Sequence, residues 1–233
     1  MPFARSLAVL ALLGLSAGCG EMPTAASNAS AKKKRKSPVV AVDTRPRLPN
    51  VAQDDYASLE SAMAEVETLS TDPEGGQKLL RIELWLTMQG DKIAPQLAAL
   101  IKDPSAGLAT RLTACRALAR LGLIATPTLL EAISGEPKQL RLKAIESLGR
   151  VKPTSKDAVT RLVALLDDQD YEARKTSLTA LSSVGPPAKE HDPAIVQKLM
   201  SILNDTKEDE TIRALAKQAL KSIDPRKGLM NAY

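Results

Sequence analysis

The sequence predicts an all-α protein of stacked helix pairs, that is, an α-solenoid. Apolar residues make up 44% of the 233 residues but aromatic residues only 2%, so the core must consist of Leu, Ala, Ile and Val. Such a core suits helices better than sheets. After residue 50, apolar residues recur at helical spacing. One helix pattern also returns every 30 to 39 residues, which is typical of repeat proteins.

Residues 1–18 are predicted to form a signal peptide. They carry one positive charge, Arg5, followed by an apolar run over residues 7–18 that is too short to span a bilayer. The run ends Leu-Ser-Ala-Gly-Cys, which resembles the lipobox of bacterial lipoproteins, although Ser16 stands where that motif usually has Leu. The resemblance implies that Cys19 is lipidated and anchors the chain. The alternative is an ordinary secretory signal with an incidental cysteine.

Residues 19–50 are predicted to form a disordered basic tether, because they are rich in Ala, Ser, Thr and Pro without apolar periodicity. Five consecutive cations in it could contact anionic lipid headgroups, or could simply be solvated; they are Lys32, Lys33, Lys34, Arg35 and Lys36. In a nuclear adaptor the same run would be an import signal. Residues 51–233 hold 24 Lys/Arg and 25 Asp/Glu, so the body is nearly neutral and no nucleic-acid partner is expected.

Four segments of the body share one pattern, in which an arginine is followed by apolar or small residues at +3, +7 and +10. They begin at Arg111, Arg141, Arg174 and Arg213. A weaker copy begins at Arg81. Because +3, +7 and +10 lie on one face of a helix, each segment should bury that face. Further Leu- and Ile-striped helices are expected between these segments, over residues 95–101, 127–133, 158–166 and 193–203.

The Arg-x-x-Ala-x-x-x-Leu-Gly-x-Val pattern resembles HEAT repeats over residues 76–225, especially the short bacterial kind found in phycobilin lyases. The resemblance implies a right-handed α-solenoid of about four to five helix pairs in the armadillo-like superfamily. Residues 51–75 would form a capping helix and residues 76–233 the repeat domain. It also implies that the arginines are structural and face turn aspartates in a ladder; the candidates are Asp103, Asp170 and Asp205.

Residues for catalysis or metal binding are scarce in the sequence. The chain has one histidine, His191, so neither a zinc cluster nor a Ser/His/Asp set can be assembled. Cys115 is the second of two cysteines and is expected to be a free buried thiol. No catalytic residue, metal or cofactor is therefore predicted.

The partner site is predicted on the concave face, lined by the arginine-led helices. Their +2, +5 and +9 positions lie outside the core stripe and give a positive strip of Arg116, Arg120, Lys143 and Arg150. An acidic protein segment or another anionic envelope component would bind there; the alternative is a solvated helix surface.

The function predicted on this basis is a non-catalytic, membrane-anchored interaction or assembly scaffold of the bacterial cell envelope. It would be a monomer on the outer membrane, facing the periplasm. The alternatives are a phycobilin-lyase-like HEAT-repeat protein and the nuclear adaptor, which uses the basic run as an import signal.

Overall fold

In the part of the chain that the structure describes, the regular secondary structure is entirely helical. The computed structural model describes residues 51–52, 55–72 and 75–226, and contains no strand within them. The α-helices are α1 (Leu59–Leu69), α2 (Gly76–Met88), α3 (Ala94–Lys102), α4 (Leu108–Arg120), α5 (Thr126–Ala132), α6 (Lys138–Arg150), α7 (Lys156–Ala164), α8 (Tyr171–Val184), α9 (Pro187–His191), α10 (Ile195–Asn204) and α11 (Glu210–Ile223). Short 3-10 helices cover Gly90–Ile93, Gly122–Ala125 and Leu165–Asp167. The predicted all-α class is thus confirmed.

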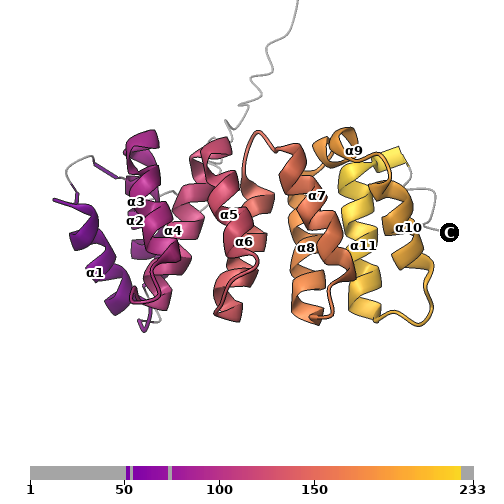
Figure 1. The fold of residues 1–233 in the computed structure, drawn as a ribbon, viewed down its shortest axis with the longest axis horizontal. Coiled ribbons are helices and arrows are strands. Elements are labelled where there is room, and N and C mark those ends of the chain that lie inside the picture. The colour runs from indigo at the N-terminus through magenta and orange to yellow at the C-terminus, as the bar shows by residue number, and fades with distance from the viewer. Residues whose placement is uncertain (1–50, 53–54, 73–74, 227–233) are drawn as a thin grey trace, which may run out of the picture. The chain divides into compact units, whose positions relative to one another are not determined.

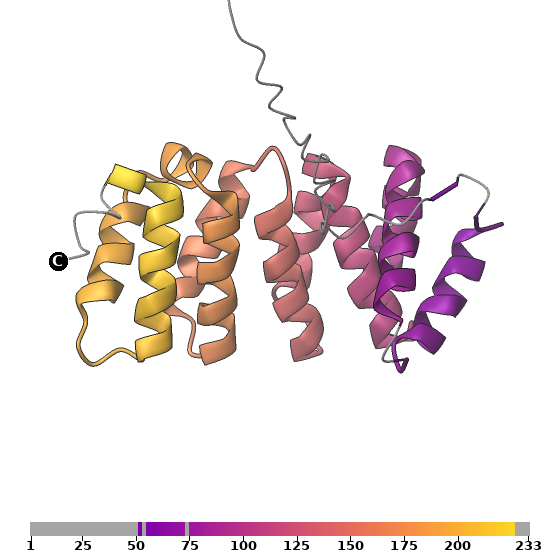
Figure 2. The ribbon, with the colours of Figure 1, turned by 180° about the vertical axis from the view of Figure 1, so that it is seen from behind.

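The helices pack in two layers (Figures 1 and 2). Helices α2, α4, α6, α8 and α11 each contact the next in that order, and we call them the arginine-led layer. The second layer consists of α3, α5, α7 and α10, each packed against the helix that follows it in the first layer. Helix α1 packs against α2 and α4. This stacking of consecutive pairs confirms the predicted α-solenoid.

The core of the stack lies where the repeat pattern predicts it. The +3 and +7 positions are at most 1% exposed in all four arginine-led segments; they are Ala114 and Leu118, Ala144 and Leu148, Ser177 and Leu181, and Ala216 and Leu220. The one polar member, Ser177, donates its hydroxyl to the carbonyl of Leu162 in α7. No polar group is therefore stranded at these positions, and aliphatic burial holds each pair to its neighbours.

Helices α6 and α8 approach each other closely. A Cβ atom added at Gly149 would lie 2.6 Å from the Cα of Ala180, so only glycine fits there. Just beyond α6, Lys152 Nζ donates to the carbonyls of Ser183 and Val184 at the end of α8, at 3.0 Å each. Burial lowers the pKa of Lys152. One repeat thus satisfies orphan carbonyl groups at the helix end of the next.

Candidate functional site

The four cations predicted to bind a partner lie on two neighbouring helices. Arg116 and Arg120 are one turn apart on α4, and Lys143 and Arg150 lie on α6, which packs against α4. We call these four residues the cation strip. The side chains of Arg120 and Arg150 are 42% and 56% exposed, whereas those of Arg116 and Lys143 are 24% and 23% exposed. The strip therefore has two half-buried members and two that reach solvent.

A buried carboxylate that sequence reasoning missed anchors one end of the strip. Glu83 of α2 forms an ion pair with Arg116 Nε, and its second oxygen lies 3.8 Å from Arg120. The Glu83 side chain is only 8% exposed. Arg116 also donates to the hydroxyl of Thr113 at 3.1 Å. Glu83 stands at +2 from Arg81 in the weak first repeat, which is the register of Thr113 and Lys143, so the repeat alignment could have found it.

A second carboxylate, Glu146, lies between the two cations of α6. Lys143 Nζ donates to one of its oxygens at 2.5 Å, and Arg150 lies 2.5 Å from the other. Burial alone would raise the pKa of Glu146. The hydrogen bond from Lys143 and the charges of Lys143, Arg150 and Arg116 outweigh that effect and lower the pKa. Glu146 therefore stays ionised at neutral pH.

The strip and its acids together carry a net charge of about +2. Glu146 lies on a helix of the strip, whereas Glu83 comes from α2. Separating a half-buried cation such as Arg116 or Lys143 from its carboxylate costs free energy. The more exposed guanidinium groups of Arg120 and Arg150 have further N–H donors. The outer donors can bind an anion while Arg116 and Lys143 stay paired with Glu83 and Glu146.

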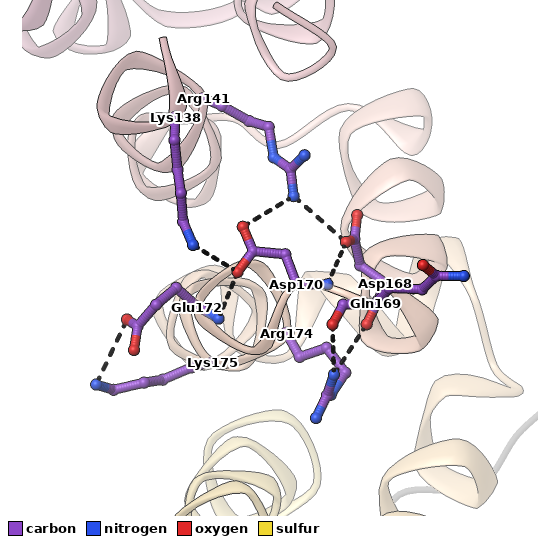
Figure 3. Close-up of polar contacts among 8 residues, drawn as sticks. All are labelled: Lys138, Arg141, Asp168, Gln169, Asp170, Glu172, Arg174 and Lys175. Atoms are coloured by element: carbon purple, nitrogen blue, oxygen red, sulfur yellow. Dashed lines mark hydrogen bonds and ion pairs between the residues drawn. The ribbon is translucent and has the colours of Figure 1, made fainter. Parts of the chain in front are cut away.

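A second polar cluster joins α6 to the turn before α8 (Figure 3). Arg141 lies 3.3 Å from both Asp168 and Asp170, and Lys138 lies 2.8 Å from Asp170. Asp170 also accepts the backbone N–H of Glu172, which caps α8. The hydrogen bond from Lys138 is the largest cause of a lowered pKa at Asp170. Each carboxylate here is engaged with its own helix start or with α6, so this cluster is structural.

The predicted arginine–aspartate ladder is thus present at Asp170 but not at the other two aspartates. Asp103 accepts from the N–H and hydroxyl of Ser105, and Asp205 accepts the N–H of Lys207. Arg111 instead donates to the carbonyl of Ile101 at 3.0 Å. Asp170 makes the same kind of local bond, to the N–H of Glu172, and also pairs with Arg141, so the local bond does not by itself exclude the ladder.

The ladder also uses an acid that the sequence did not suggest. Arg174 lies 3.6 Å from Glu208 in the turn before α11, and it donates to the carbonyls of Asp168 and Gln169. The turn before α11, residues 205–209, is longer than the turn before α8, residues 168–170, and the acid that reaches the arginine lies three residues beyond Asp205.

Cys115 and His191 both take structural positions. Cys115 is 0% exposed, and burial raises the pKa of its thiol to about 12, so the thiol stays protonated and unreactive at neutral pH. The His191 Nε2 lies 3.0 Å from the carbonyl of Thr154. Within the described residues, no group of three His, Cys, Asp or Glu side chains could hold a metal ion.

Several predicted features lie outside the described residues: the signal peptide over residues 1–18, the lipidation site Cys19 and the basic run from Lys32 to Lys36. Among the helices that the structure does describe, none has the length and apolarity to cross a bilayer.

Comparison with known proteins gives matches of two kinds. A family model described as HEAT repeats matches residues 126–221. In solved structures, the chain is similar to a chain in the complex of CpcE and CpcF of phycocyanin lyase from Nostoc sp. PCC7120, with a TM-score of 0.54 and 17% sequence identity. The similarity covers 70% of this chain and 99% of that one. A search of curated protein sequences found no match.

The family match bears out the predicted HEAT resemblance, and the structural match agrees with the helical solenoid. The structural match also corrects the predicted function. The similar chain belongs to a lyase complex, which favours the alternative of a phycobilin-lyase-like protein over a non-catalytic membrane scaffold. The same finding speaks against the prediction that the chain is not an enzyme. At 17% identity the similarity itself shows the fold alone.

Proposed function

We propose that the chain is a phycobilin-lyase-like HEAT-repeat protein that binds a linear tetrapyrrole pigment at the cation strip. The observation that carries this proposal is the structural match, because it spans 99% of a chain of the phycocyanin lyase complex. The pigment is an organic anion with a large apolar body. It needs a surface with spare positive charge, and the strip is such a surface, with Arg120 and Arg150 half exposed.

The test uses the full-length chain in detergent, mixed with phycocyanobilin and separated by gel filtration. We expect pigment to co-elute with the chain at about one molecule per chain and with a shifted absorption band. Pigment that then moves onto added apo-phycocyanin and survives denaturation would demonstrate lyase activity. A chain that elutes without pigment at every concentration tested would refute the proposal.

A strip variant must spare Arg116. Its guanidinium is paired with the nearly buried Glu83, so a carboxylate at position 116 would face another carboxylate and disturb the fold. Arg120 and Arg150 can be replaced more safely, because Glu83 keeps Arg116 and Glu146 keeps Lys143 as partners. A pair of substitutions at these two positions therefore tests binding separately from folding.

The location and partners of the protein belong to the same proposal, and the sequence alone supports them. The residues before position 19 have the features of a signal peptide, and Cys19 ends a lipobox-like run. We propose export and attachment to the outer membrane facing the periplasm, with the basic run against anionic headgroups. An acidic protein segment, such as one on the protein that accepts the pigment, is the proposed macromolecular partner of the strip.

A further inference from the structure

Arg120 and Arg150 occupy equivalent positions in consecutive repeats. Each lies at +9 from its leading arginine and ends its helix, α4 or α6. Neighbouring helices in such a layer are roughly 8–10 Å apart, so equivalent side chains start from points separated by about that distance. Both side chains are long enough to adapt, and a ligand with two anionic groups could engage both at once.

The charge balance of the strip matches such a ligand. Four cations and two carboxylates leave an excess of two positive charges. Arg120 lies 3.8 Å from Glu83, at the edge of ion-pair range, and Arg150 pairs with Glu146 at 2.5 Å but its side chain is 56% exposed. Each guanidinium has five N–H donors, and its planar fork fits a carboxylate through two parallel hydrogen bonds. Two carboxylates would therefore neutralise the excess.

An exposed apolar pair lies at the same end of the two helices. Leu123 and Ile124 lie in the short 3-10 helix after α4 and are 48% and 46% exposed. The turn that carries them begins at Gly122, where an added Cβ would lie 3.0 Å from the carbonyl oxygen of Lys152, just past the end of α6. This turn thus packs against the residue that lies two positions beyond Arg150. Leu123 and Ile124 therefore lie near the end of α6 that carries Arg150.

We infer that this end of α4 and α6 is a subsite for a tetrapyrrole with two carboxylate groups, a step that rests on the proposed function. Arg120 and Arg150 each bind one propionate carboxylate, and Leu123 and Ile124 contact the apolar ring system. Glu83 and Glu146 pair with Arg116 and Lys143 and also contact Arg120 and Arg150, but the side chains of the two outer arginines are 42% and 56% exposed and keep further N–H donors for the ligand.

Biliverdin and its dimethyl ester test this assignment, because they share the ring system and differ in the two carboxylates. Binding of each is measured by absorbance titration with full-length wild-type chain and with the variant R120Q/R150Q. The wild type should bind the diacid about 100-fold more tightly than the diester, or about 10-fold for each arginine, as expected for charge-assisted hydrogen bonds. The variant should bind the two compounds about equally.

Two further variants separate the contributions. K102Q/K198Q removes the same two charges from α3 and α10, where Lys102 and Lys198 form exposed ion pairs, and it should keep the preference for the diacid. L123S/I124S should weaken diacid and diester binding by the same factor, because both compounds share the apolar contact. Thermal unfolding followed by circular dichroism verifies that every variant is folded.

The outcomes distinguish failure of the inference from failure of the proposed function. Equal affinity of the wild type for diacid and diester overturns the inference and leaves pigment binding intact. A preference that persists in R120Q/R150Q, or disappears equally in K102Q/K198Q, also overturns it. If the wild type binds neither compound, both the proposed function and the inference are wrong.

Discussion

Arg116 of α4 and Glu83 of α2 form an ion pair across two adjacent helices, and the carboxylate partner is only 8% exposed. The pair joins the weak first repeat to the first complete one. A charge that is nearly buried depends on its partner, because water cannot replace the lost interaction. The stability of the N-terminal part of the stack should therefore depend on Glu83 more than its place in a weak repeat suggests.

Glu83→Gln tests this dependence. The substitution leaves the Arg116 guanidinium, which is 24% exposed, without a carboxylate, so we expect unfolding to become easier by about 2–3 kcal/mol. Urea unfolding measures the change. Glu131→Gln is the matched control, since Glu131 pairs with Lys102 on the surface and should cost under about 1 kcal/mol. Equal losses in the two variants would contradict the prediction.

Gly149→Ala should destabilise the stack by about 1–3 kcal/mol, because the added methyl group meets the backbone of Ala180 in α8. Thermal unfolding reports the loss. Gly76→Ala serves as the control, because nothing lies within 4 Å of a Cβ at Gly76. Alanine is a better helix former, so that variant should be neutral or slightly more stable. An unchanged midpoint for Gly149→Ala would mean that α6 and α8 are further apart.

Asp170→Asn should lower stability at pH 7 and lose this effect in acid. Asparagine caps a helix about as well as aspartate, so the substitution removes the charge facing Lys138 and Arg141 but keeps the cap of α8. The pKa of Asp170 is lowered in the folded protein, so its stabilisation is present above the unfolded-state pKa of about 3.9 and is lost as pH falls through the folded value.

The measurement for Asp170 is urea unfolding of wild type and variant between pH 7 and pH 2.5. The two curves should converge toward the acid end. Asp170→Ala should lose about 1 kcal/mol more at every pH, because it also removes the cap. A difference between wild type and Asp170→Asn that grows on acidification would show that the charge is not the cause.

Cys115 should resist thiol reagents in the native state. Its side chain is fully buried and its thiol pKa is raised to about 12, so Ellman's reagent at pH 8 should label it only after unfolding in denaturant. The experiment uses the Cys19→Ser background, which leaves one thiol. Because the folded-state pKa exceeds the unfolded value of about 8.5, Cys115 should also make stability fall as pH rises from about 9 toward 12. Rapid native labelling would refute the assigned burial.

Cys19→Ser should abolish lipidation, because the thioether to the lipid requires the thiol. Detergent phase partitioning after expression in a bacterial host compares the variant with the wild type. We expect the wild type in the detergent phase and the variant in the aqueous phase. If both partition with the detergent, the lipid attachment proposed from the lipobox-like run is wrong.

The buried face of the arginine-led helices could be predicted from the sequence because the same apolar spacing occurs in four segments. Ala144, Leu148 and Val151 are all 0% exposed, as their spacing from Arg141 requires. Such periodicity depends only on helix geometry, which is the same in every repeat. The fold class followed from it directly.

The partners of the charged residues could not be predicted in the same way. The spacing of the leading arginines varies from 30 to 39 residues, so the turns differ in length and the acid nearest each arginine differs too. Asp168 and Glu208 were missed for this reason. Glu83 was missed because its contact with Arg116 joins two repeats and becomes evident only when the +2 positions of neighbouring repeats are compared. The function was mispredicted because a repeat fold can serve many chemistries.

Helices α6 and α8 are held together by contacts at three positions along their length. Arg141 binds the turn before α8, Gly149 lets the two backbones meet, and Lys152 binds the carbonyls at the end of α8. Under a stretching force these ties would have to break together. The stack should therefore tear first at its lightly tied first helix, α1, and release α6 and α8 as one mechanical block.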